Sequence, residues 1–197
     1  MRALQISAYG DPLNVLELVD IPEPGVPGAG EVLIDVELTP VNLHDLLFIR
    51  GYFGGPPAPT VVGNEGFGRV AAVGPGVTNV KVGDHVLAPI LGLTWRARMI
   101  ASAQGLFPLP DGDRLQLAQL GSNPPTAALI LSEYADLKPG DWVVQNAGNS
   151  GVGRSLSAIA KQRGIRTISF VRRPELIDEL KAAGADVVLL EPVRNFT

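Results

Sequence analysis

The sequence contains no cysteine. Disulfide bonds, thiolate nucleophiles and cysteine-based zinc sites are therefore excluded, since each needs a sulfur atom that the chain does not carry. Histidine is nearly as scarce. The only two, His44 and His85, are far apart in the sequence and have no cluster of carboxylates beside them, which argues against a metal site. We therefore predict a protein that works without a bound metal.

Charge and long hydrophobic runs are scarce as well. Charged residues make up 18% of the 197 residues, and 16 Lys and Arg against 20 Asp and Glu leave a net charge of -4. Such a chain has no general electrostatic attraction to nucleic acid or to an anionic membrane. No apolar run approaches the ~20 residues of a membrane-spanning helix, and no signal peptide opens the sequence. We expect a globular, cytoplasmic protein that binds neither nucleic acid nor membrane.

Glycine and proline are abundant, at 23 and 17 residues, and their distribution divides the chain. Up to about residue 112, short β-rich segments alternate with Gly and Pro turns, which predicts a small barrel or sandwich. Strands are expected at 15–19, 31–38, 67–73, 85–89 and 97–101, and one short helix at 43–49. Segment 51–59, with three glycines and three prolines, is expected to be an irregular loop of the kind that often carries function.

From about residue 113 the hydrophobic pattern changes its period. Helices are expected at 114–120, 125–134, 151–163 and 174–183, and strands at 142–145, 167–171 and 186–190. Apolar strands that alternate with helices predict a parallel sheet covered by helices. The predicted fold class is therefore α/β with a β-rich N-terminal part, and the predicted domains are 1–112 and 113–197.

A glycine-dense turn follows the strand at 142–145. Gly148, Gly151 and Gly153 have the spacing G-x-x-G-x-G, which differs from the usual G-x-G-x-x-G of dinucleotide-binding turns. Strand, turn, helix and second strand nevertheless follow in the order that a dinucleotide-binding unit requires. Free N–H groups and the dipole at the start of a helix favour a phosphate there. A tight turn without a ligand is the alternative reading.

Two basic residues follow the second strand of this unit. NAD enzymes of this plan have an acidic residue about 20 residues beyond the glycines, which binds the ribose hydroxyls. No Asp or Glu occurs between Asn149 and Pro174, and the strand is followed by Arg172 and Arg173. Two guanidinium groups suit a 2′-phosphate. We therefore predict NADPH as the cofactor in preference to NADH, with a pair of solvated loop arginines as the alternative.

Several segments together resemble a known family. They are Val41-Asn42, Gly51-Tyr52, Gly63-Asn-Glu-Gly66, Val82-Gly83-Asp84, Asn123-Pro-Pro-Thr-Ala127 and Gln145-Asn-Ala-Gly-Asn-Ser-Gly-Val-Gly153. In combination they are similar to the medium-chain dehydrogenase/reductase superfamily, in its zinc-free branch. Within that branch the chain resembles the 2-enoyl thioester reductases of the mitochondrial trans-2-enoyl-CoA type, with quinone oxidoreductases as neighbours.

The resemblance implies a GroES-like catalytic domain followed by a Rossmann domain, with NADPH in the cleft between them. Zinc-dependent members have a histidine ligand where this chain has Asn64, so the resemblance also implies that zinc is absent. It implies Tyr52 as the catalytic proton donor and a homodimer as the assembly. The cofactor-binding residues that it implies are Asn123, Asn149, Ser150, Gly151, Val152, Arg172 and Arg173.

The implied reaction reduces the C=C bond of a 2-enoyl thioester carried on CoA or acyl carrier protein. A hydride adds to the β-carbon, and the α-carbon of the resulting enolate takes a proton, which a phenol can supply. The family usually has Gly directly after its tyrosine, whereas Phe53 follows Tyr52. Tyr9 lies near a turn, and Tyr134 is expected on the packed side of a helix, so neither competes well as the donor.

Two alternatives stay open. One is an NADPH:quinone oxidoreductase, which needs no proton donor, and the other is a nucleotide-binding fragment without catalysis. Family members continue beyond the third Rossmann strand, whereas these 197 residues include only about three such strands. We therefore expect the second domain to be the N-terminal half of a Rossmann domain, and the chain by itself to have little activity.

Overall fold

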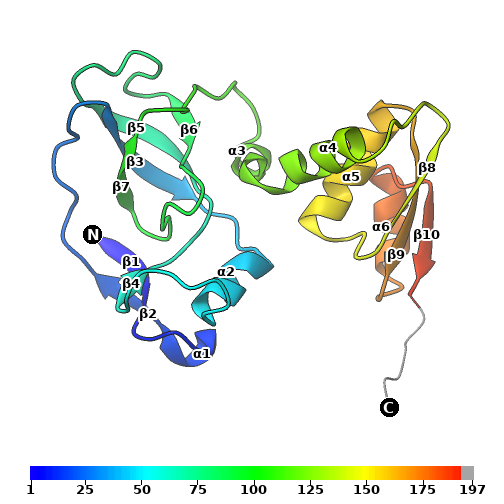
Figure 1. Ribbon diagram of the computed structural model, residues 1–197, viewed down its shortest axis with the longest axis horizontal. Coiled ribbons are helices and arrows are strands. Elements are labelled where there is room, and N and C mark those ends of the chain that lie inside the picture. The colour runs from blue at the N-terminus through cyan, green and yellow to red at the C-terminus, as the bar shows by residue number, and fades with distance from the viewer. Residues whose placement is uncertain (192–197) are drawn as a thin grey trace. The chain divides into compact units, whose positions relative to one another are not determined.

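The computed structural model of the chain describes residues 1–191 (Figure 1). The chain divides into two compact units, Met1–Gly121 and Ser122–Thr197. The division lies beyond residue 112, where the composition changes, because the next segment packs on the first unit. Helix α3 (Arg114–Leu117) and the 3₁₀ turn η1 (Ala118–Gly121) follow Asp113, whose side chain accepts from Leu115 N at 2.8 Å. Arg114 pairs with Glu37, and Ala118 is buried.

The first unit is built on two antiparallel sheets. One has the strand order β2-β1-β4 and the other β6-β5-β3-β7. The strands of the first sheet are β1 (Arg2–Ile6), β2 (Leu16–Asp20) and β4 (Thr60–Val61). Those of the second sheet are β3 (Glu31–Leu38), β5 (Phe67–Val73), β6 (His85–Leu87) and β7 (Arg98–Ser102). Two short helices complete the unit, α1 (Pro12–Val15) and α2 (Leu43–Ile49).

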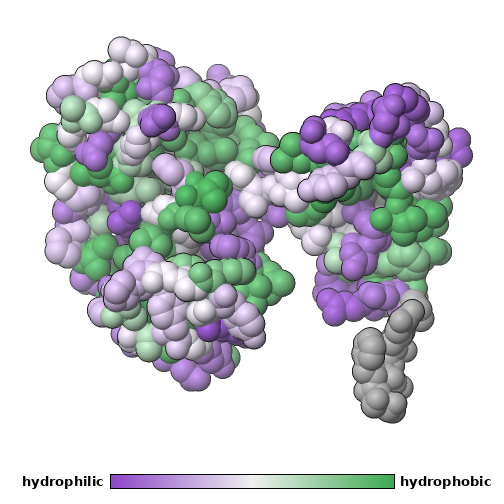
Figure 2. Space-filling model, viewed as in Figure 1, coloured by the Kyte–Doolittle hydropathy of each residue, from purple (hydrophilic) through white to green (hydrophobic). Residues whose placement is uncertain are grey.

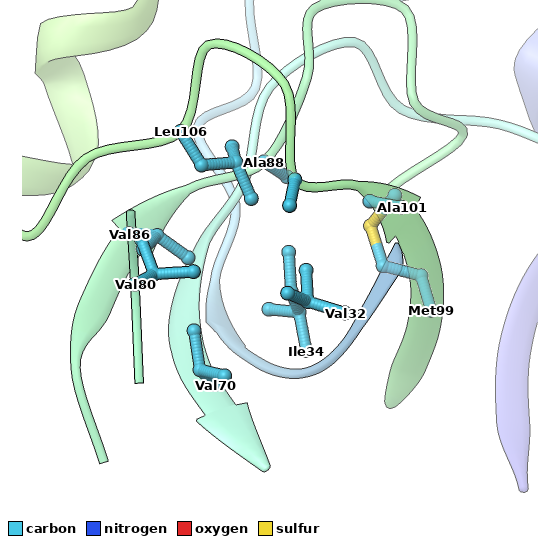
Figure 3. Close-up of a cluster of buried hydrophobic side chains, with 10 residues drawn as sticks. Val32, Ile34, Val70, Val80, Val86, Ala88, Met99, Ala101 and Leu106 are labelled. Carbon is cyan, nitrogen blue, oxygen red and sulfur yellow. The ribbon is translucent and has the colours of Figure 1, made fainter. Parts of the chain in front are cut away.

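The core of the second sheet follows from its hydrophobic alternation. Val32 and Ile34 of β3 are fully buried and lie two residues apart, so their side chains share one face of the strand. Figure 3 shows them at the centre of the cluster, with Val70 and Val86 on one side and Met99 on the other. At roughly 25 cal/mol per Å² of apolar surface, each such side chain contributes about 1.5–3 kcal/mol to folding.

The second unit contains a parallel sheet with the strand order β10-β9-β8. Its strands are β8 (Trp142–Gln145), β9 (Arg166–Val171) and β10 (Val187–Leu190), and its helices are α4 (Asn123–Glu133), α5 (Gly151–Gln162) and α6 (Leu176–Ala182). Leu156 and Ala160 of α5 are buried in one cluster with Ala127 and Leu131 of α4. The amphipathic stripe of α5 is therefore its packed face, which confirms the predicted α/β pattern.

The predicted elements are mostly confirmed, and the exceptions have local reasons. Strands β3, β5 and β8 and helix α2 have the predicted bounds. The helix expected at 114–120 is instead a single α-turn that continues as the 3₁₀ turn η1. Helix α1 and strand β4 were not predicted, because four and two residues are too short to show a hydrophobic period. Aspartate at the N-cap and proline at the first position are the signals of α1.

The surface of each unit mixes polar and apolar residues. Figure 2 shows hydrophobic and hydrophilic residues interspersed over the visible face of both units. Exposed apolar side chains in the first unit include Leu43, Phe53 and Leu91. No helix within residues 1–191 combines the length and the apolar character needed to cross a membrane.

Candidate functional site

The glycine turn of the second unit connects β8 to α5. Ser150 is the N-cap of α5, and its hydroxyl accepts from Gly153 N at 3.1 Å. Helix α5 has 12 residues, so its first turn presents free N–H groups and the positive end of a helix dipole. These are the features that hold a phosphate at the start of a helix.

The three glycines are required by packing. A Cβ at Gly148 would lie 2.7 Å from Ser169 Cβ, and one at Gly153 would lie 2.8 Å from the carbonyl oxygens of Ala147 and Gly148. A Cβ at Gly151 would lie 2.5 Å from Asn123 Nδ2. Ala147 is the residue of this turn with a positive φ, at 47°. The glycines therefore allow the backbone to approach its neighbours closely, as a phosphate-binding turn needs.

Gln145, the last residue of β8, anchors the turn through its side-chain amide. Its Nε2 lies 3.0 Å from Gly153 O, 3.0 Å from Ser157 Oγ and 2.9 Å from Ser169 Oγ. Ser157 and Ser169 are both buried, so these bonds satisfy hydroxyl groups that water does not reach. Gln145 thus ties β8 to α5 and β9, a role that its place in the sequence motif did not predict.

Most of the predicted cofactor residues lie around this turn. Gly148 N donates to Phe170 O at 3.0 Å, so the turn lies beside the end of β9, which Arg172 and Arg173 follow directly. Both arginines are exposed, and Arg173 lies 3.8 Å from Glu175. Arg172 has no ion pair within residues 1–191. One guanidinium of the pair is therefore available to an anionic ligand.

The remaining predicted cofactor residues differ in position and in their contacts. Asn123 is the first residue of α4, and its amide lies against Gly151. Asn149 is half-buried, and its carbonyl accepts from Arg154 Nε at 3.1 Å. Val152 packs against the α4–α5 core. Arg154, which sequence reasoning passed over, also pairs with Glu179 at 2.8 Å and so joins the turn to α6.

In the first unit, Tyr52 lies in the loop directly after α2. Its backbone N donates to Leu47 O at 3.1 Å, and Gly51 before it has a φ of +86°. The side chain is 73% exposed, and its hydroxyl has no hydrogen bond within residues 1–191. The neighbouring ring is held more firmly, because Phe53 stacks on His44 with centroids 4.7 Å apart and 14° between planes. The fold therefore fixes the loop and leaves the Tyr52 phenol free.

The other two tyrosines have different positions. The Tyr9 hydroxyl donates to Pro56 O at 2.7 Å, and its ring meets Phe48 edge-on, so Tyr9 anchors the far end of the same loop. Tyr134 was expected to face the packed side of a helix, which is wrong. Helix α4 ends at Glu133, and Tyr134 is the C-cap with its side chain 83% exposed.

The Gly63–Gly66 segment is held by carboxylates. Buried Asp45 accepts from Asn42 N at 2.7 Å and from Asn64 N at 2.9 Å. The Asn64 side-chain oxygen in turn accepts from Leu91 N at 2.9 Å. Glu65 is only 2% exposed, and its Oε1 accepts from Asn42 Nδ2 at 2.7 Å. Within residues 1–191, no group of three or more His, Asp or Glu side chains is placed to hold a metal ion.

The two units of the chain resemble parts of known proteins. Residues 28–111 match the alcohol dehydrogenase GroES-like domain. The homologues of the chain are enoyl-acyl-carrier-protein reductases and quinone oxidoreductases. Both kinds of homologue are members of the medium-chain dehydrogenase/reductase superfamily.

Three relatives show how far the likeness extends. The human mitochondrial enoyl-[acyl-carrier-protein] reductase is 42% identical over 97% of this chain, and the match covers 53% of that protein. A mycobacterial protein solved in complex with NADPH is 36% identical with a TM-score of 0.88, over 98% of this chain and 60% of that one. A Pseudomonas syringae quinone oxidoreductase is 32% identical with a TM-score of 0.86, over 95% and 58%. The chain thus spans about half the length of the curated relatives that it matches.

Proposed function

We propose that the protein to which this chain belongs is an NADPH-dependent oxidoreductase that reduces the C=C bond of 2-enoyl thioesters. The observation that carries the proposal is the 42% identity with an enoyl-acyl-carrier-protein reductase over 97% of the chain. The glycine turn supports it independently, since the turn has the close packing and the helix N-terminus that a pyrophosphate needs.

The residues of the second unit fit NADPH. The turn leaves no room for a Cβ at Gly148, Gly151 or Gly153, so it packs as closely as a phosphate-binding turn requires. Asn123, Asn149, Ser150, Gly151 and Val152 are the residues that would hold the pyrophosphate part of the cofactor. Arg172 and Arg173 would pair with the 2′-phosphate through charge-assisted hydrogen bonds. When bound, the nicotinamide supplies the hydride.

The residue assigned to the proton is Tyr52. Hydride addition to the β-carbon leaves negative charge on the thioester oxygen, and the α-carbon then needs a proton. A free, exposed phenol at the edge of the fixed loop is able to reach a substrate, whereas Tyr9 is already bonded to Pro56. In this proposal Tyr52 donates its O–H proton to the α-carbon and regains one from solvent.

Quinone reduction is the second candidate function. It is favoured by the likeness to the Pseudomonas syringae quinone oxidoreductase and by the absence of a hydrogen bond that orients the Tyr52 hydroxyl within the described residues. Hydride transfer to a quinone needs no proton donor positioned beside a particular atom of the substrate. The two functions therefore differ in how they respond to the loss of the Tyr52 hydroxyl.

One set of assays separates these functions. NADPH oxidation is followed with crotonyl-CoA and with a quinone, for the wild type, Tyr52→Phe and the exposed control Tyr134→Phe, after the intact mass of the protein is measured. A general acid is worth about 10²–10⁴-fold, so Tyr52→Phe should lose roughly 100-fold on crotonyl-CoA and Tyr134→Phe nothing. The second candidate would be established by two results together. The wild type would not turn over crotonyl-CoA, and Tyr52→Phe would reduce the quinone as fast as the wild type does. NADPH binding without turnover of either acceptor would indicate a nucleotide-binding fragment.

The cofactor preference has its own test. The double variant Arg172→Ala/Arg173→Ala should weaken NADPH binding by roughly 10-fold or more and leave NADH binding nearly unchanged, because a hydrogen bond to a charged group is worth about 1.5–3 kcal/mol. Arg163→Ala is the matched control, an exposed arginine at the other end of α5. Equal losses for both cofactors would argue against a 2′-phosphate site.

A further inference from the structure

His44 is a titratable residue to which the proposed function assigns no role. It is the second residue of α2 and is half-buried, yet its Nε2 is fully buried and has no hydrogen-bond partner within residues 1–191. A buried polar atom without a partner costs about 1–3 kcal/mol, so it is kept only where something compensates.

The buried side of the ring borders a small cavity. The cavity has a volume of about 20 Å³, and its lining includes His44, Asp45, Asn64, Leu91 and Leu93. A water molecule needs roughly 10–15 Å³ measured in this way and two to four polar partners. The lining residues His44 and Asp45 both carry polar groups, and the carboxylate of Asp45 has lone pairs beyond the two backbone N–H groups that it accepts. The cavity therefore suits one water molecule.

The backbone around the cavity is strained on its far side. Leu91 and Leu93 have φ angles of 62° and 55°, in the left-handed region that side chains with a Cβ rarely occupy. Such strain costs about 1–3 kcal/mol per residue and clusters at functional sites. On the near side, the stacked Phe53 joins the His44 ring to the loop that carries Tyr52. The stacking on Phe53 therefore places His44 beside the loop that carries Tyr52.

We propose that His44, together with Tyr52, supplies the proton that this site delivers to the substrate, by way of a water molecule in the cavity. The inference rests on the proposed enoyl thioester reduction. When bound, the nicotinamide would supply the hydride that forms the C–H bond at the β-carbon. The Tyr52 O–H bond breaks, and its proton forms the C–H bond at the α-carbon of the enolate. The Tyr52 oxygen then takes a proton from the cavity water, His44 gives its Nε2 proton to that water, and His44 regains a proton from solvent, so that all three groups return to their starting states.

Few charged groups surround the ring. Asp45 lies on the same helix, Glu65 follows Asn64 in the segment across the cavity, and Arg96 donates to Gly92 O at 3.2 Å between the two strained leucines. Imidazole nitrogens can both take up and release a proton, which makes histidine a suitable proton shuttle. The pH dependence of turnover is therefore a direct readout of the proposal.

The cavity water is tested without any turnover. In the ¹⁵N-labelled protein, the His44 ring is assigned by comparison with His85→Gln, and a cross-peak is sought between a His44 ring proton and a long-lived water. Its presence supports the relay, and its absence overturns it. The measurement uses the chain as it exists and does not depend on its activity.

The catalytic part is tested with NADPH and crotonyl-CoA across pH 5–9. His44→Gln should lower kcat by roughly 100-fold with KM nearly unchanged, and should flatten the pH profile of kcat. His85→Gln is the matched control and should behave as the wild type. Phe53→Leu removes the stacking partner but keeps the imidazole, so it reports damage to the loop alone and should keep the wild-type pH profile.

The outcomes are distinct. A His44→Gln variant with the wild-type kcat or the wild-type pH profile overturns the proposal, and so does a pH profile that Phe53→Leu flattens equally. A wild type that binds NADPH but reduces no enoyl thioester is a failure of the proposed function, and the water cross-peak then decides on the His44–water pair by itself. Losses in both His44→Gln and Tyr52→Phe support a shared proton path.

Discussion

Substitution of Ser150 by alanine removes the cap of the helix on which the proposed cofactor site depends. The Ser150 hydroxyl accepts from Gly153 N at 3.1 Å, and its backbone has the extended conformation of an N-cap. Alanine keeps that conformation but offers no acceptor, so one N–H of the first turn loses its partner. The lost hydrogen bond destabilises α5, whose Leu156 and Ala160 form a core cluster with α4.

The expected loss of stability follows from the loss of the cap alone. Replacing an N-cap serine by alanine costs about 1 kcal/mol, within a range of roughly 0.5–2 kcal/mol. For a unit of roughly 60–100 residues, 1 kcal/mol lowers Tm by about 4–8 °C. The assay is urea unfolding followed by far-ultraviolet circular dichroism, together with a thermal melt of the same samples. The midpoint should fall without a change in the slope m, because the surface exposed on unfolding stays the same.

Two further variants make this prediction falsifiable. Ser155→Ala is the matched control, since the Ser155 hydroxyl donates to Gly151 O at 2.8 Å from the interior of the same helix, where alanine is the better helix former. Ser150→Asp should keep the stability, because aspartate caps as well as serine, but should weaken NADPH binding by placing a negative charge where the phosphate belongs. Equal stability of Ser150→Ala and Ser155→Ala would refute the capping argument.

Three other substitutions test the packing that supports the site. Ile34→Ala removes a fully buried side chain from the β3 core and should cost about 2–5 kcal/mol in urea unfolding, whereas a cost below about 1 kcal/mol would mean that the core is not closely packed there. Gly148→Ala should lower stability and NADPH affinity together, because its Cβ would lie 2.7 Å from Ser169 Cβ, and the added variant Ser169→Gly should restore part of both in a double-mutant cycle. Asp45→Asn replaces one of the two oxygens that accept backbone N–H groups by an amide donor, and should lower the free energy of unfolding by about 1–3 kcal/mol. An unchanged unfolding midpoint would contradict the role of Asp45 in holding Asn64.

Helices and strands could be predicted from the sequence wherever the pattern of apolar residues was long enough to show a period. The bounds of β3, β5 and α2 follow from apolar periodicity and from the turn residues beside them. The four-residue α1 and the two-residue β4 have no such period, and β4 exists because Thr60 and Val61 pair with Ile6 and Gln5 of β1. A pairing of that kind depends on the folded chain and leaves no local pattern.

The candidate site divides in the same way. The absence of acidic residues between Asn149 and Pro174, together with the presence of Arg172 and Arg173, is a property of the sequence, and it is enough to predict the cofactor preference. The reason for each glycine in the turn was not readable, because the atoms that exclude a Cβ at Gly148 belong to Ser169 of the next strand.

The sequence by itself determined the order of strands and helices, the class of fold and the place of the glycine turn, because these follow from periodicity and residue type along the chain. Only the tertiary structure decided that Tyr9 is an anchor bonded to Pro56, that Asp45 holds Asn64, and that His44 borders a cavity with Leu91 and Leu93. Each of these contacts joins residues that are far apart in the sequence. Hydrogen bonds and burial between such residues arise only when the chain closes around them, so a linear pattern does not encode them.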